Sequence, residues 1–313
     1  MNILRKPPRF TLAVMVSALV CITALILLFT FAMEVDAKGK PAKPPNGNTA
    51  YSSHIELHDI DSSLTSPSGQ FRWLDIADQA YGEAYRNGYD YTQARVIVAY
   101  TPSAASLRGQ LTANNLKPNF AYQVKLAGDP LEYPEANENI GFVGRWWREV
   151  WDGASAWIGG QNSSDSDYLA NGGVTDPTSP TRLKYKFTGY LVFDYFSTDS
   201  KGNAVLEFEV DSSYHVLWKT SQRVPAPGDG EVKTATYKVN AKSSPAYDVN
   251  FGRVTVGVYG EVERPPVGGQ YPASGLYDCH FFLTEESFHG SGGSYAGNWA
   301  AAMGAPISFE ISD

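Results

Sequence analysis

Cysteine and histidine are both scarce in this chain of 313 residues, which has two cysteines and five histidines. Cys21 lies inside an N-terminal apolar run, so Cys279 is the one cysteine of the part that follows. An intrachain disulfide is therefore excluded in that part. The chain does not depend on one, because a protein of this length can bury a large enough core without covalent cross-links.

Positively charged residues are fewer than negatively charged ones. The sequence holds 25 lysines and arginines against 33 aspartates and glutamates, which gives a formal net charge of -8. Proteins that bind nucleic acid present basic faces to the phosphate backbone. The charge balance therefore argues against nucleic acid as a partner.

The usual signatures of hydrolytic and nucleotide-dependent enzymes are missing. The chain contains no G-x-S-x-G, no H-E-x-x-H and no P-loop. Carboxylates that could form an acid–base pair are Glu149, Asp152, Asp194 and Asp199. Such a pair must lie roughly 5 to 10 Å apart across a cleft, and sequence spacing does not test that separation. We expect a protein without a bound cofactor and regard an enzyme as the less favoured alternative.

A basic N-terminus followed by an apolar run at 10–33 is the layout of an export signal, and the residues VDA at 35–37 fit a cleavage site. The run is also long enough to cross a bilayer, so an uncleaved anchor with its basic end inside is the alternative. We interpret residues 1–37 as a signal peptide or membrane anchor and 38–50 as a linker rich in Pro, Gly and Lys. In both cases the rest of the chain lies outside the cytoplasm.

The remainder of the chain favours strands. The whole sequence contains 19 Tyr, 15 Phe, 29 Gly and 19 Pro. This composition is typical of proteins with short strands joined by tight turns. Period-two alternation predicts strands at 54–58, 94–100, 107–113, 120–126, 184–196, 204–210, 214–218, 232–239, 253–262, 276–283 and 306–311. We therefore predict an all-β, antiparallel β-sandwich over 51–313, with a long Trp-rich insertion at 127–183.

Two local patterns resemble known sandwich modules. Leu116, Pro118 and Tyr122 occur in the order Leu-x-Pro-x-x-x-Tyr, which resembles the tyrosine corner of fibronectin type III domains. The stretch STDSKGNAVLEFEV at 197–210 resembles a hairpin of bacterial immunoglobulin-like modules. The resemblance implies that the Tyr122 hydroxyl bonds back to the main chain and that Gly202 has a positive φ. Stretches such as GRWW and SSYHVLWKTSQR also resemble exported prokaryotic proteins, and this likeness implies no function.

Four of the seven tryptophans fall within 142–157. Phe142, Trp146 and Val150 recur at four-residue spacing, which predicts a short helix with aromatic flanks. An insertion of this kind in a fold of short strands is either a cap on the core or a functional loop.

The aromatic side chains of this insertion are the leading candidates for ligand contact. Exposed indoles stack on sugar faces and anchor protein interfaces, and neighbouring guanidinium groups add hydrogen bonds. The candidate contact residues are Trp146, Trp147, Trp151, Arg145 and Arg148. The alternative is that the tryptophans form a satellite core at one end of the sandwich.

The stretch SGLYDCHFFLTEESFHGSGG concentrates possible metal ligands. If 276–283 is a strand, Cys279 and His280 point to opposite faces and do not share one metal ion. Cys279 then lies on the apolar face as a small buried hydrophobic residue. The residues that follow, TEESFHGSGG at 284–293, are expected to form a polar turn.

A metal-binding or redox site in this region is the alternative from a different functional class. Its ligands are Cys279, His280 and His289, with His215 as a remote partner. The spacing does not match a blue-copper site, because Met303 lies far beyond His289.

Two further polar stretches are predicted to be exposed to solvent rather than to bind a metal ion. In HIELHD, His54, Glu56 and His58 alternate with apolar residues, which predicts one exposed face of an edge strand. NSSDSDY at 162–168 is expected to be a solvated loop, and Asn162 begins a glycosylation sequon.

Together these patterns predict an exported or membrane-tethered cell-surface β-sandwich module for binding, adhesion or envelope structure. Its expected partner is a cell-surface polysaccharide or protein. Self-association through exposed strand edges is a third alternative.

Overall fold

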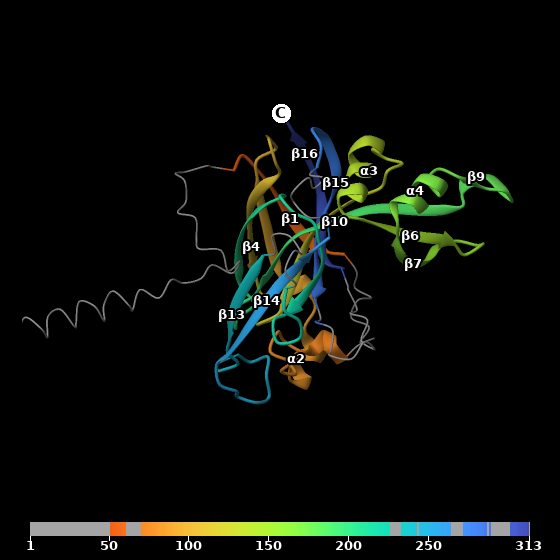
Figure 1. Ribbon diagram of the computed structural model, residues 1–313. Helices are drawn as coiled ribbons and strands as arrows, with labels where there is room; N and C mark the ends of the chain where they lie inside the picture. The colour runs from red at the N-terminus through yellow and green to blue at the C-terminus, as the bar shows by residue number, and fades with distance from the viewer. Residues whose placement is uncertain are drawn as a thin grey trace, which may run out of the picture.

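The computed structural model describes residues 51–60, 70–225, 233–242, 244–263, 272–286, 288 and 301–312. The predicted signal or anchor and the linker, residues 1–50, lie outside this part. Within it, no helix is both long enough and apolar enough to cross a bilayer. The chain is built mainly from antiparallel strands (Figure 1), which confirms the predicted all-β class.

The main sheet contains eleven strands. Its hydrogen-bonded order is β11 (Ala204–Glu209), β4 (Arg108–Asn114), β2 (Arg95–Tyr100), β1 (Ser53–Asp59), β16 (Ala301–Ile311), β15 (Gly275–Glu286), β5 (Ala121–Gly128), β10 (Tyr185–Ser197), β6 (Arg145–Trp151) and β7 (Trp157–Ser163). The short strand β3 (Ser103–Ala104) pairs with β16 in parallel.

Two smaller sheets and a few short helices complete the described structure. The three-stranded sheet has the order β12 (Tyr214–Lys219), β14 (Val254–Val262) and β13 (Thr234–Val239), and β8 (Thr175–Asp176) pairs with β9 (Ser179–Leu183). The helices are η2 (Gln70–Trp73), α2 (Glu83–Gly88), η3 (Tyr91–Gln93), α3 (Pro134–Val143) and α4 (Asp165–Asn171). Over its described residues, each of the eleven segments that alternation predicted as strands lies within a strand, to within one or two residues at the ends.

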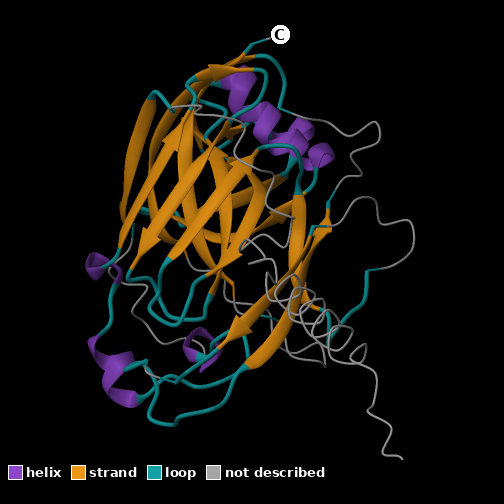
Figure 2. Cartoon of the chain, turned by 90° about the vertical axis from the view of Figure 1, so that its left-hand side faces the viewer, coloured by secondary structure: helices purple, strands orange, loops and turns teal. Residues whose placement is uncertain are grey.

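The main sheet curls so that its two halves enclose one hydrophobic core (Figure 2). The ring of Phe208 on β11 lies 5.6 Å from that of Phe193 on β10 and 5.6 Å from that of Phe281 on β15, centroid to centroid. A strand at one end of the sheet therefore packs against β15 in its middle and against β10 near its other end. Such burial of aromatic side chains is the main driving force for this arrangement.

The three-stranded sheet forms a further layer on the outer face of β5 and β10. Val192 and Tyr195 of β10 pack there against Leu217 of β12 and Val258 of β14. The body is thus more elaborate than a single two-layer sandwich. This strand order does not confirm the specific immunoglobulin or fibronectin topology.

The corner that resembles fibronectin domains has the hydrogen bond that the resemblance implies. The backbone N–H of Lys117 donates to the hydroxyl oxygen of Tyr122 over 3.1 Å, and the carbonyl of Pro118 accepts from Tyr81 over 2.5 Å. Gly202 has a φ of +79°, and a Cβ there would lie 1.9 Å from the carbonyl oxygen of Leu116. Only glycine fits this close approach.

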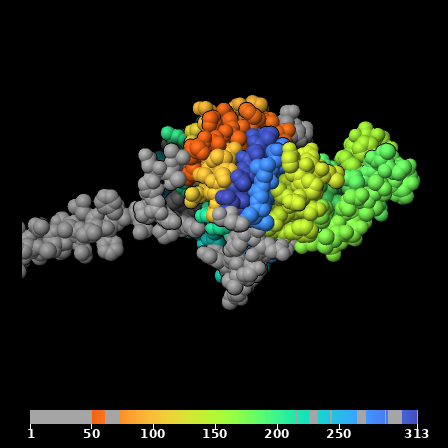
Figure 3. Space-filling model, turned by 90° about the horizontal axis from the view of Figure 1, so that it is seen from above, coloured from red at the N-terminus to blue at the C-terminus, as the bar shows by residue number. Residues whose placement is uncertain are grey.

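Most of the predicted insertion forms an arm that projects from the body, defined here as residues 145–190 (Figures 1 and 3). It consists of β6, β7, α4, β8, β9 and the first part of β10. The helix predicted from the Trp spacing is wrong, because α3 ends at Val143 and the aromatic stretch is strand β6. This strand pairs with β10 and so joins the arm to the main sheet.

Two other expectations need correction. The residues from Thr284 to Glu286 do not form a polar turn, because β15 continues through them and all three are buried. The strand that carries His54 and His58 is not an edge strand, because β1 pairs with both β2 and β16, although these histidines are exposed. The predicted loop at 162–168 includes the start of α4.

Candidate binding face of the arm

The sheet of the arm has one covered face and one open face. Successive residues of a strand point to opposite sides, and β6 pairs without a register shift with β10. Trp146, Arg148 and Val150 therefore share one face, and Arg145, Trp147, Glu149 and Trp151 share the other. We call the second of these the outer face.

Trp146 lies on the covered face and forms the centre of a small separate core. Its side chain is fully buried and stacks on Tyr168 of α4, with ring centroids 3.7 Å apart and an interplanar angle of 8°. Phe187 completes this core, and the indole N–H donates to Asp165 over 3.1 Å. Trp146 is therefore not a surface contact residue, and the satellite-core alternative describes it correctly.

Arg148 is also engaged on the covered face. Its guanidinium forms an ion pair with Asp167 of α4 at 2.7 Å, and its carbon Cζ lies 4.8 Å from the ring centroid of Tyr185. Arg148 therefore helps to hold α4 on the covered face of the sheet.

Trp147 lies on the outer face, and 38 % of its surface is exposed. Its indole crosses β7 at Gly160, where an added Cβ would lie 2.2, 2.3 and 2.4 Å from Cζ2, Cε2 and Nε1 of the ring. Because three ring atoms are almost equally close to that point, the indole lies flat against the backbone. Gly160 therefore allows the opposite face of the ring to point toward solvent.

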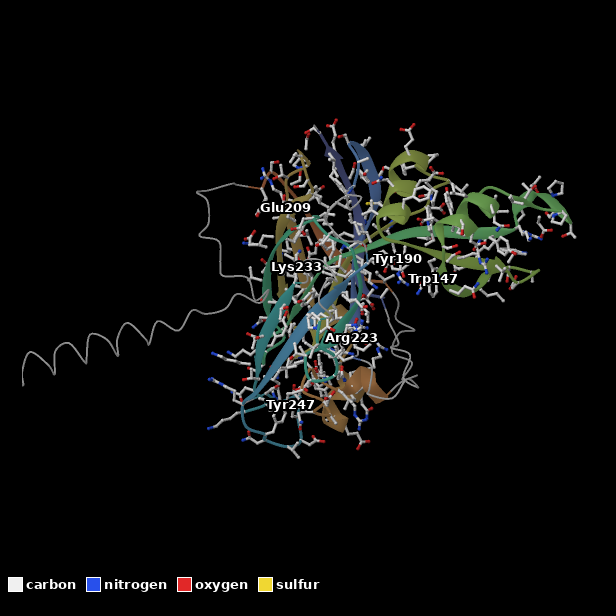
Figure 4. The ribbon with its side chains drawn as sticks, viewed as in Figure 1. Trp147, Tyr190, Glu209, Arg223, Lys233 and Tyr247 are labelled. Carbon is white, nitrogen blue, oxygen red and sulfur yellow. The ribbon has the colours of Figure 1, made fainter. Side chains whose placement is uncertain are left out.

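Polar side chains surround this indole. In the strand register, Trp147 stands opposite Thr188 of β10 on one side and Asn162 of β7 on the other. The hydroxyl of Tyr190 donates to Oδ1 of Asn162 over 2.6 Å, and Figure 4 shows Tyr190 and Trp147 close together at the root of the arm. Burial raises the pKa of Tyr190 to about 12, so its hydroxyl remains a donor at neutral pH.

The charged residues on either side of Trp147 lie near residues of opposite charge. Arg145 forms an ion pair with Glu263 at 2.8 Å, with both side chains about one fifth exposed. Glu149 stands opposite Lys186 in the strand register. The outer face therefore combines an aromatic platform with a nearly neutral rim of hydrogen-bonding groups.

A second aromatic group lies toward the tip of the arm. Trp151 and Trp157 are opposite each other in the register, and their ring centroids are 5.5 Å apart at an interplanar angle of 72°. The guanidinium carbon of Arg182 lies 5.2 Å from the ring centroid of Trp151, and Arg182 forms an ion pair with Asp176 at 2.6 Å. Trp151 is thus half-buried by a tethered arginine.

The structure separates the proposed metal ligands. Cys279 is buried in the main core, where burial raises the pKa of its thiol far above the ordinary value, while His280 is exposed on the other side of β15. His289 and the side chain of His215 lie outside the described residues. Across the described ranges, no cluster of three or more His, Cys, Asp or Glu residues could hold a metal ion.

Sequence reasoning identified Trp147, Trp151 and Arg145 but missed the residues that shape their surroundings. Gly160, Thr188 and Tyr190 carry no local motif, and Asn162 was noted only as a sequon. Had residues 145–151 been predicted as a strand paired with residues 185–190, these side chains would have been placed on one face of a sheet. No protein-family model, curated protein or solved structure matches the chain.

Proposed function

We propose that this protein is an exported or membrane-tethered binding module of the cell surface, and that it acts in adhesion or envelope structure through the outer face of its arm. The observation that carries the proposal is the presentation of Trp147. Its indole is held flat against Gly160 with one face toward solvent, on an element that projects from the body. An exposed indole contributes little to the stability of the fold, but it provides a large contact surface for a ligand.

The N-terminal pattern supports the cell-surface location. A basic start, an apolar run at 10–33 and a polar linker at 38–50 would place the folded body and its arm outside the cytoplasm. The metal or redox alternative is less well supported, because the buried thiol of Cys279 and the exposed imidazole of His280 point away from each other.

Co-sedimentation with isolated cell envelopes tests the proposal. The wild-type protein should sediment saturably with envelope material, and Trp147→Ala should weaken this binding about tenfold or more, as for a central interface residue. Trp218→Ala is the matched control, because Trp218 is a half-buried tryptophan on β12 whose indole N–H donates to Glu261 over 2.5 Å. Unchanged sedimentation of the Trp147→Ala protein would reject the outer face as the binding surface.

A further inference from the structure

We propose that the outer face of the arm binds an extended, uncharged polysaccharide, with one sugar ring stacked on Trp147 and a second sugar of the same chain beside Trp151. This inference rests on the proposed function and assigns the chemical class of its ligand. The six residues that would carry it are Arg145, Trp147, Glu149, Trp151, Asn162 and Thr188.

The chemistry of the platform fits a sugar ring. A pyranose presents C–H groups on its faces and hydroxyl groups around its edge, so it needs an apolar plane surrounded by donors and acceptors. The flat indole of Trp147 supplies the plane. Thr188 and Asn162 flank it across the strands, and Asn162 offers its amide NH₂ as a donor while its Oδ1 accepts from Tyr190.

The surroundings of Trp147 do not fit an ordinary protein-docking surface. Energetically dominant residues of protein interfaces lie in well-packed pockets that lose their water on binding. Here the indole has Arg145 and Glu149 as its neighbours on the same face of β6, and polar residues across the strands on both sides. Desolvating such a rim without replacing its hydrogen bonds would be costly, whereas sugar hydroxyls replace them.

The charges of the outer face favour an uncharged ligand. Arg145 is neutralised by Glu263 at 2.8 Å, and Glu149 faces Lys186 across the strands. Lys186 also lies 3.9 Å from Asp129. An anionic polymer would find no free cationic row among these side chains, and the chain as a whole carries a net charge of -8.

The spacing of the aromatic groups points to a chain rather than a single sugar. Trp147 and Trp151 are four residues apart on β6, which corresponds to roughly 13 Å along a strand. Both side chains lie on the outer face, with Glu149 between them. A ligand that contacts both tryptophans must span more than one sugar ring.

Binding to immobilised neutral polysaccharides tests this inference. The full chain in detergent is applied to an α-glucan, a β-glucan, a mannan and a galactan, with polygalacturonate as the anionic comparison. We expect saturable binding to at least one neutral polymer and none to polygalacturonate. Trp147→Ala should weaken binding about tenfold or more, Gly160→Val should weaken it by lifting the indole, and Trp218→Ala should leave it unchanged.

Several results would overturn the inference. They are the absence of binding to all four neutral polymers, preference for polygalacturonate, or binding that Trp147→Ala does not affect. Failure of this inference is distinguishable from failure of the proposed function. If envelope binding depends on Trp147 and is destroyed by protease treatment of the envelopes but not by periodate, the ligand is a protein and the binding function stands.

Discussion

At the scale of single residues, the most unexpected feature is a buried cluster of charges around Glu285. This carboxylate accepts hydrogen bonds from Arg72 at 2.7 and 2.9 Å, from Lys117 at 2.7 Å and from the hydroxyl of Tyr91 at 2.7 Å. Tyr91 in turn bonds to the Tyr122 hydroxyl at the corner. The cluster therefore ties the end of β15 to the corner that precedes β5.

Glu285→Gln should destabilise the protein by about 3–5 kcal/mol, because it leaves two buried cations without their counter-charge. Burial alone would raise the pKa of Glu285, but Lys117 and Arg72 lower it below its ordinary value. Its contribution should therefore be present above the ordinary carboxyl pKa and be lost as pH falls through the lowered one. Urea denaturation measures the change in free energy of unfolding.

The control for that measurement is Glu56→Gln. Glu56 pairs with Arg95 on the surface at 3.1 Å, with side chains 46 % and 65 % exposed. Exposed pairs contribute about 0–1 kcal/mol. Equal losses of stability in the two variants would contradict the structural role given to the Glu285 cluster.

Glu286 should show the opposite pH dependence. Burial raises the pKa of its carboxyl, although the charge of the buried Lys125 and a hydrogen bond from Gln123 act in the opposite direction, and its Oε1 has no hydrogen-bond partner among the described residues. A raised folded-state pKa contributes stability that is complete below the ordinary pKa and lost as pH rises. The wild type should therefore lose stability relative to Glu286→Gln between about pH 5 and about pH 8. Denaturation curves with the same pH dependence for both proteins would refute this.

The two glutamates illustrate what a local sequence pattern cannot disclose. Alternation over 276–283 correctly placed Cys279 on a buried face, because strand periodicity is a local property. The burial of Glu285 depends on partners 213 and 168 residues away, Arg72 and Lys117. A local sequence pattern does not identify partners so far away. Two adjacent glutamates, such as Glu285 and Glu286, are therefore most simply interpreted as part of a polar turn.

At the scale of secondary-structure elements, the arm has its own small core and should respond to mutation separately from the body. Trp146, Tyr168 and Phe187 form this core, apart from the main one. Trp146→Ala should cost about 3–5 kcal/mol of local stability. In hydrogen exchange, amides of β6, β7 and α4 should lose protection while those of β2 and β4 keep theirs. Uniform loss of protection would show that the arm and body unfold as one unit.

The structure of the arm also explains why its main strand was mistaken for a helix. Phe142, Trp146 and Val150 recur every four residues, and a helix places such residues on one face. A strand does the same, because four is an even number and alternate residues share a face. The four-residue spacing therefore does not distinguish a helix from a strand. The pairing of β6 with β10 shows that residues 145–151 form a strand. Strands such as β11 and β13 show alternation of buried and exposed residues along their length, which is specific to strands.

At the scale of the whole molecule, a curled β-sheet body carries a projecting arm, and the sequence that precedes them has a pattern typical of export. The body supplies rigidity through its enclosed core and its additional three-stranded layer. The arm extends from the body along the first part of β10 (Figure 3), and Trp147 lies near the root of the arm (Figure 4).

The proposed function requires that Trp147 contacts the ligand and that its neighbour Trp146 does not. Oxidative footprinting with mass spectrometry tests it directly, because both residues fall within one short peptide. In the free protein Trp147 should be oxidised and the fully buried Trp146 should not. On addition of cell envelopes, Trp147 should become protected and Trp146 should remain unreactive. Undiminished oxidation of Trp147 in the envelope-bound protein would contradict the account.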